Sequence, residues 1–146
     1  MGVLIEQPGL YPNVSAYENL KLLAIAYGLS DRDTTIEKLL RLVGLDPKNT
    51  AKVKSYSMGM KQRLGIAVAL LGSPDVLILD EPINGLDPQG IVEIRELILE
   101  LNAAGLTILI SSHILEELSK NRHQVCHHPS GRICRGDLQG RIAAAL

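Results

Sequence analysis

The sequence of 146 residues contains no phenylalanine and no tryptophan, and it has only two cysteines, Cys126 and Cys134. Without large aromatic side chains of these kinds, a core must be built from leucine, isoleucine, valine and alanine. Two cysteines are too few for a disulfide framework, so a reducing, cytosolic setting is the default expectation. Apolar residues still make up 46% of the chain, which is enough for a folded domain and argues against intrinsic disorder.

The sequence also lacks a long apolar run and an excess of charge of either sign. The most apolar stretches, residues 66–71 and 76–79, are far shorter than the ~20 residues that cross a bilayer. Fifteen basic and sixteen acidic residues give a formal charge of −1, so no net charge attracts the chain to nucleic acid or to an anionic membrane. Any role at a membrane is therefore expected to depend on a partner chain.

The first half of the chain predicts mainly helices. A short apolar run, Val3–Ile5, is typical of a strand end, and a loop rich in proline and glycine follows it. Ser15 and Glu18 form a capping-box pattern at the start of a helix that ends near residue 28. A second helix is expected over residues 33–44, where apolar side chains recur at helical spacing before a glycine.

The second half predicts alternating strands and helices. The apolar run at 76–79 favours a strand that is buried on both faces. An Asp-Pro pair opens a helix expected over 87–105, with aspartate as N-cap and proline at the first helical position. A further strand is expected over 106–111 and a short helix over 115–120. This order predicts a right-handed parallel unit of an α/β fold.

Two carboxylates, Asp80 and Glu81, directly follow the first of these buried strands. Open α/β sheets bind ligands at the carboxyl ends of their strands. An acid at this place can hold Mg²⁺ through water, and a second acid beside it can orient or deprotonate a water that attacks phosphorus. The structural alternative is that the pair only ends a strand and begins a turn.

Three further segments carry polar residues at helix starts or strand ends, where they could contact a ligand. Ser57 and Gly59 put a hydroxyl and an uncluttered backbone at a helix N-terminus, which favours phosphate, although an ordinary capped helix from about 59 to 71 would look the same. The Asn-Gly-Leu-Asp loop ending at Asp87 reads equally as a turn plus an N-cap. His113 follows the strand at 106–111, and a lone histidine there is usually a surface residue.

Taken in order, these features resemble the ATP-binding cassette (ABC) ATPase family over residues 3 to about 120. The resemblance implies an α/β fold, namely a partial P-loop NTPase whose helical subdomain is followed by a parallel-sheet βαβα segment. The implied layout is a glutamine-loop region at 1–14, a helical subdomain with the signature helix at 15–72, a segment from Walker B to the switch histidine at 73–120, and a divergent tail at 121–146.

The same resemblance assigns roles to individual residues. The signature of the family would be a variant here, with Tyr56 in place of its leucine and methionines in place of its first glycine and its glutamine. Asp80 would be the Walker B magnesium-associated acid and Glu81 the catalytic base. His113 would be the switch histidine that contacts the γ-phosphate. The residues implied to contact nucleotide are Ser57, Met58, Gly59, Met60, Gln62 and the D-loop Asp87.

The glutamine loop leaves two candidates for a ligand of magnesium or its water. Alignment from the downstream Glu-Asn-Leu sequence places Glu6 at the usual glutamine position, and Gln7 is the fallback. Either side chain offers an oxygen, but a carboxylate would add charge to the local field of the metal.

Two parts of the chain depart from the family. The sequence G-x-x-x-x-G-K-[ST] occurs nowhere, whereas family members carry this phosphate loop upstream of the glutamine loop. We therefore expect a chain that begins after that loop and binds ATP weakly by itself. Beyond residue 120 the sequence diverges, and a degraded or frame-shifted stretch explains it more simply than a metal site at Cys126, His127 and His128.

The resemblance predicts an ATP-binding, ATP-hydrolysing subunit that uses ATP and Mg²⁺ to power export. Its partners would be a second ABC ATPase domain, as a homodimer, and an integral membrane permease that holds it at the cytoplasmic face. The sequence of the loop at residues 8–13, together with the variant signature, resembles exporters of the bacitracin and lantibiotic resistance group. The alternative is a non-catalytic interaction module that supplies only its signature face to a partner ATPase. DNA repair or translation relatives are disfavoured, and no nucleic acid partner is expected.

Overall fold

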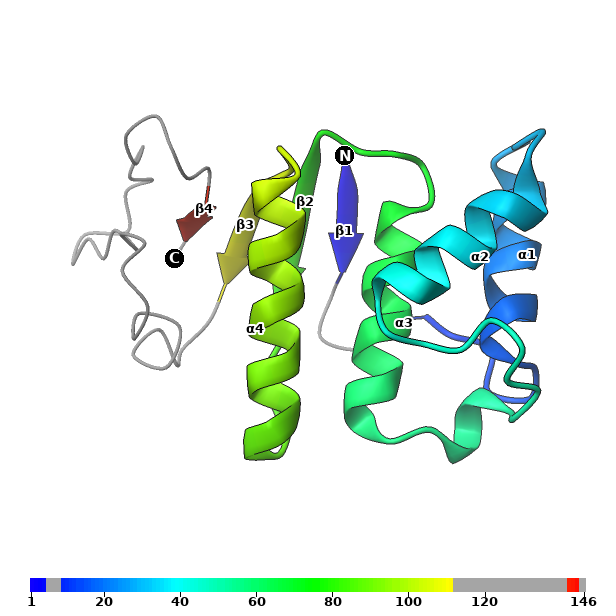
Figure 1. Ribbon diagram of the computed structural model, residues 1–146, viewed down its shortest axis with the longest axis horizontal. Helices are drawn as coiled ribbons and strands as arrows, with labels where there is room; N and C mark the ends of the chain where they lie inside the picture. Colours follow the sequence, from blue (N-terminus) through cyan, green and yellow to red (C-terminus); the bar gives the residue numbers. More distant parts are fainter. Residues whose placement is uncertain (5–8, 112–141, 145–146) are drawn as a thin grey trace. The chain divides into compact units, whose positions relative to one another are not determined.

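The computed structural model describes residues 1–4 and 9–111, together with the backbone of 142–144 (Figure 1). The chain divides into two compact units. One comprises Met1–Glu6 and Asp75–Leu146, and the other comprises Gln7–Pro74.

The first unit contains a parallel β-sheet, and its described strands are β1 (Gly2–Leu4), β2 (Val76–Asp80), β3 (Thr107–Ser111) and β4 (Ile142–Ala144), in that spatial order. Each neighbouring pair is parallel. Helix α4 (Pro88–Ala103) connects β2 to β3 and runs alongside the sheet (Figure 1). The predicted parallel α/β unit is therefore confirmed.

Strand β2 is buried on one face but only partly covered on the other. Leu77 and Leu79 have no exposed surface, whereas Val76 and Ile78 are half-buried. In β1, Val3 pairs with Ile78 in register and is 49% exposed. In the part of the chain that the structure describes, the prediction that this strand is buried on both faces is therefore wrong for one of them, since Val76, Ile78 and Asp80 alternate with the buried leucines and are only half-buried.

The second unit is helical. It contains α1 (Ala16–Ala26), α2 (Arg32–Leu42), the 3₁₀ turn η1 (Val53–Ser55) and α3 (Met58–Leu70). Helix α1 packs against α2, and both contact α3. Their shared core is aliphatic, with Leu20, Ile36, Leu40 and Leu64 fully buried.

The predicted helix boundaries hold because the local capping groups are present. Ser15 accepts the N–H of Glu18, and Glu18 accepts the N–H of Ser15, which together form the predicted capping box of α1. Gly44 follows α2 with φ +70°, a conformation that favours glycine. Within the described residues, no helix is both long and apolar enough to cross a membrane.

Candidate nucleotide site

Asp80 is the last residue of β2, and its carboxylate is held from the neighbouring strand. The Ser111 hydroxyl at the end of β3 donates a 2.8 Å hydrogen bond to Asp80 Oδ1. The two residues are direct partners in the parallel register. This bond occupies one carboxylate oxygen and fixes the direction of the other at the carboxyl end of the sheet, the edge where α/β sheets bind ligands.

Glu81 has an unusual backbone conformation. Its φ is +48°, which is uncommon for a residue with a Cβ and costs free energy unless the surroundings enforce it. Its N–H donates to the Ser111 carbonyl at 2.9 Å, and its own carbonyl accepts from Asn84 N–H at 3.1 Å. Ser111 therefore contacts both acids, through its side chain and through its backbone. Sequence reasoning missed Ser111, whose role depends on strand pairing alone.

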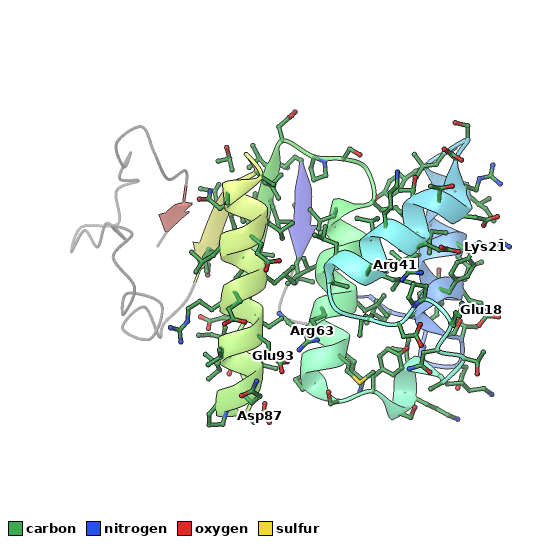
Figure 2. The ribbon with its side chains drawn as sticks, in the orientation of Figure 1. Glu18, Lys21, Arg41, Arg63, Asp87 and Glu93 are labelled. Atoms are coloured by element: carbon green, nitrogen blue, oxygen red, sulfur yellow. The ribbon has the colours of Figure 1, made fainter. Side chains whose placement is uncertain are left out.

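The loop after these acids connects β2 to α4. Gly85 has φ +72°, and Asp87 is the N-cap of α4, accepting the N–H of Gly90 at Oδ1 over 2.9 Å (Figure 2). A Cβ at position 90 would lie 2.7 Å from that same oxygen, so a side chain there would disturb the cap. The predicted structural role of Asp87 is therefore confirmed, and its nucleotide contact stays a prediction.

The signature-like segment lies at the start of α3. Ser57 is exposed and is the N-cap, accepting the N–H of Met60 at 3.2 Å. Met58 is 56% exposed, and Gly59 and Met60 are half-buried. A helix start of this kind presents backbone N–H groups and the positive end of the helix dipole to an anion.

Gln62 differs from the other residues of this segment because it is buried, with 5% of its surface exposed. Its Nε2 has no hydrogen-bond partner among the described residues. The neighbouring Arg63 donates a long, 3.5 Å hydrogen bond to the Gly44 carbonyl, which connects α3 to the end of α2. Gln62 is thus a buried residue of the unit Gln7–Pro74, and its contact with nucleotide remains a prediction.

The predicted site residues fall into two groups in separate units. Ser57, Gly59 and their neighbours belong to the unit Gln7–Pro74, whereas Asp80, Glu81 and Asp87 belong to the other. Glu6, Gln7 and His113 lie outside the described residues, as do the cysteine and histidines of the tail.

The donor set suits magnesium better than a metal held wholly by protein. The described residues contain no cluster of three or more histidine, cysteine, aspartate or glutamate side chains placed to hold a metal ion. Mg²⁺ needs no such cluster, since it prefers oxygen ligands, keeps several waters and is usually held by one or two carboxylates together with phosphates. Asp80, with Glu81 beside it, fits this pattern.

Known proteins share this sequence pattern. A sequence profile described as ABC transporter matches residues 1–84. The lantibiotic transport ATP-binding protein SrtF of Streptococcus pyogenes is 53% identical over 118 residues, which are 81% of this chain and 51% of that protein. The bacitracin transport ATP-binding protein BcrA of Enterococcus faecalis is 50% identical over 121 residues, covering 82% of this chain and 39% of that protein.

Solved structures agree with the fold. The cbiO1 protein of Clostridium perfringens, part of an ABC transporter complex, superposes with a TM-score of 0.70 and 32% identity over 77% of this chain and 46% of that one. The ATP-binding cassette MJ0796, a dimer bound to ADP and Pi, gives a TM-score of 0.66 and 27% identity over 79% of this chain and 53% of that one.

This chain therefore spans about half the length of the curated relatives that it matches, 51% of one and 39% of the other. The profile match covers more than half of the chain, and the parallel sheet and helical unit agree with the ABC ATPase cassettes. The chain belongs to the ABC transporter family.

Proposed function

We propose that this chain forms part of the ATP-hydrolysing subunit of an ABC transporter. The observation that carries the proposal is the pair of acids at the carboxyl end of β2, held from β3 by Ser111 through one side-chain and one backbone hydrogen bond. An acid whose carboxylate is held, followed directly by a second acid whose backbone is held, suits a reaction in which the first acid binds a hydrated metal and the second activates a water.

ATP and Mg²⁺ are the proposed ligands, and the metal would supply charge neutralisation of the phosphates. Asp80 would hold the hydrated metal through the carboxylate oxygen that Ser111 leaves free. Glu81 orients and deprotonates the attacking water, and His113 contacts the γ-phosphate. Glu6 or Gln7 contributes an oxygen from the glutamine loop.

The segment Ser57–Met60, with Gln62 and Asp87, contacts nucleotide across a dimer with a second ABC ATPase domain. In this layout residues 15–72 are the helical subdomain and 73–120 the catalytic segment, between the glutamine-loop region at 1–14 and a tail at 121–146. An integral membrane permease is the further partner and holds the subunit at the cytoplasmic face of the membrane.

The proposed cargo is a small molecule or peptide such as an antibiotic. The names of two relatives support this class, because SrtF is described as a lantibiotic transport protein and BcrA as a bacitracin transport protein. Identities of 53% and 50% to these proteins favour a similar role for this chain.

The test is a chimera in which the phosphate-loop segment of a family member precedes this chain. We expect Mg²⁺-dependent ATP hydrolysis that is abolished by Asp80→Asn. Asp75→Asn, a change in the same unit at the other end of β2, is the matched control and should leave turnover unchanged. A well-folded chimera that binds ATP but does not hydrolyse it would contradict the catalytic proposal.

One observation favours the non-catalytic alternative, a module that supplies its signature face to a partner ATPase. The unit Gln7–Pro74 is compact, has its own aliphatic core and carries Ser57 at the exposed start of α3. The test is association of the whole chain with an intact ABC ATPase domain, measured with and without ATP. Binding that requires ATP while the chimera remains inactive would favour this module over the catalytic subunit.

A further inference from the structure

Asn19 is a buried polar residue near the start of α1, with only 1% of its surface exposed. Its side-chain oxygen accepts the N–H of Tyr11 at 2.8 Å. Its side-chain nitrogen donates to the carbonyls of Tyr11 at 3.1 Å and of Ser15 at 2.9 Å. A buried carboxamide is costly unless its groups are paired, and here both ends have backbone partners. Asn19 therefore fastens the loop of residues 9–14 to the start of α1.

The same loop is hydrogen-bonded to η1, the turn that precedes α3. The N–H of Val53 donates to the Val14 carbonyl at 3.0 Å, and the N–H of Lys54 donates to the Pro12 carbonyl at 2.9 Å. The N–H of Tyr56 then donates to the Val53 carbonyl at 3.0 Å, directly before the N-cap of α3. Hydrogen bonds, joined by the short backbone segment between Tyr11 and Val14, thus connect Asn19 to the turn directly before the signature-like helix.

Tyr56 adds a second connection to α1. Its side chain is buried, and burial raises the pKa of its hydroxyl, an effect opposed by a hydrogen bond from the Ala16 backbone. Ala16 is the first residue of α1 and is 1% exposed, so water cannot easily satisfy its N–H. Tyr56 stands where the family resemblance predicts leucine, which has no hydroxyl.

We propose that Asn19 is a positioning residue for Ser57. The carboxamide of Asn19 holds the loop of residues 9–14 against α1, and the backbone of this loop holds η1. The turn η1 in turn sets the position of Ser57, the N-cap of α3, which contacts nucleotide in the proposed function. The last step rests on the proposed function, whereas the positioning itself does not. Asn19 contacts no nucleotide in this scheme and acts only through the backbone of the segments that it joins.

The test is amide hydrogen exchange, measured by NMR on the whole chain without nucleotide. In Asn19→Ala we expect the amides of Tyr11, Val53, Lys54 and Met60 to exchange about tenfold faster or more, because each depends on the hydrogen-bonded path. The amide of Val43, the C-cap of α2, is bonded to the Leu39 carbonyl and should keep its wild-type rate.

Asn49→Ala is the matched control. The side chain of Asn49 also accepts a backbone N–H, that of Ala51 at 2.9 Å, but the bond is exposed and lies outside the path. This variant should accelerate exchange at Ala51 alone. Faster exchange at Tyr11 with unchanged rates at Val53 and Lys54 would overturn the proposal, and so would a uniform acceleration that includes Val43.

Asn19→Asp keeps the shape and the accepting oxygen but loses the donating nitrogen, so it tests the same path if the alanine variant does not fold. We expect a smaller acceleration at Val53 and Lys54, and wild-type rates there would overturn the proposal.

Association with an intact ABC ATPase domain in the presence of ATP provides the second measurement. We expect Asn19→Ala to weaken it about tenfold and Asn49→Ala to leave it unchanged. Absence of association for the wild-type chain would count against the proposed function without affecting the exchange result. Wild-type association for Asn19→Ala, with altered exchange, would remove the link to Ser57.

Discussion

At the scale of single residues, the main feature is the backbone of Glu81, which lies in the left-handed region at φ +48°. Asparagine and aspartate adopt this region more readily because their short polar side chains can form local hydrogen bonds. The longer side chain of glutamate does not give this advantage. The Glu81 N–H donates to the Ser111 carbonyl and the Glu81 carbonyl accepts from the Asn84 N–H, and these two hydrogen bonds hold the conformation. Such strain at a carboxylate beside Asp80 is the kind of local cost that functional sites retain.

Replacing Glu81 by glutamine removes the proposed base and preserves the shape of the side chain. In the chimera we expect turnover to fall on the order of 10²-fold or more while nucleotide binding is retained. Steady-state ATPase assays and a nucleotide-binding titration measure the two effects, with Glu96→Gln on the exposed side of α4 as the control. Unchanged turnover would remove Glu81 from its assigned role.

Replacing Glu81 by glycine separates stability from catalysis. Because glycine adopts positive φ without steric cost, the free energy of unfolding should rise by about 1 kcal/mol while turnover in the chimera is lost. Urea denaturation of the chain measures the first effect. Glu96→Gly, the same change inside α4, should instead lower the free energy of unfolding by about 1 kcal/mol. A loss of stability in Glu81→Gly would show that its side chain contributes more than the strain costs.

At the scale of helices, two ionisable side chains of α1, Glu18 and Tyr17, make hydrogen bonds that depend on their protonation, so the stability of the fold depends on pH. The Ser15 backbone N–H, and next its hydroxyl, lower the pKa of Glu18 at the capping box (Figure 2). Where α1 contacts α2, the hydrogen bond to Asp33 and partial burial raise the pKa of Tyr17 to about 12. The two groups therefore make α1 sensitive to pH in opposite ranges.

The capping box should weaken in acid. A carboxyl whose pKa is lower in the folded state stabilises the fold above its unfolded pKa, near 4.5, and that contribution is lost as pH falls through the folded pKa. The free energy of unfolding of the wild-type chain should therefore fall more steeply below pH 4.5 than that of Glu18→Gln. Denaturation curves between acidic and neutral pH measure the difference, and parallel curves would contradict the assignment.

The bond between α1 and α2 should weaken in strong alkali. Tyr17 donates to Asp33 Oδ1 at 2.7 Å, and only the protonated phenol can do so. Since its pKa is higher in the folded state, the stabilisation is complete below pH 10 and is lost as pH rises toward about 12. The stability difference between the wild-type chain and Tyr17→Phe should shrink over this range. Tyr27→Phe, at an exposed tyrosine, is the control and should show no such change.

At the scale of the whole chain, the sequence lacks a phosphate loop while its two units carry the other predicted contacts with nucleotide. Backbone N–H groups and the lysine of that loop supply most of the nucleotide binding in P-loop proteins. Losing several charge-assisted hydrogen bonds of ~1.5–3 kcal/mol each would remove a micromolar affinity of ~8 kcal/mol.

We therefore expect the chain alone to show no saturable binding of ATP below about 1 mM. Isothermal titration calorimetry measures this, and the chimera with a phosphate loop is the positive control because it should bind. Tight binding by the chain alone would show that its own residues form a complete nucleotide site, contrary to the proposed division of contacts.

The sequence by itself determined the features that depend on neighbours within about four residues. The capping box at Ser15, the N-caps Ser57 and Asp87 and the glycine end at Gly44 were all predictable, because a helix cap is formed between residues of one turn. The apolar run of β2 and the two acids after it were also predictable, because they too are adjacent in the sequence.

Only the tertiary structure decided the contacts between distant segments. Ser111 reaches Asp80 across 31 positions, which follows from strand register and leaves no local pattern. The half-buried face of β2 depends on which elements pack on the sheet, and the path from Asn19 to η1 depends on how the loop of residues 9–14 bonds to α1 and to η1. These contacts arise from the packing of elements, which short-range spacing in the sequence does not encode.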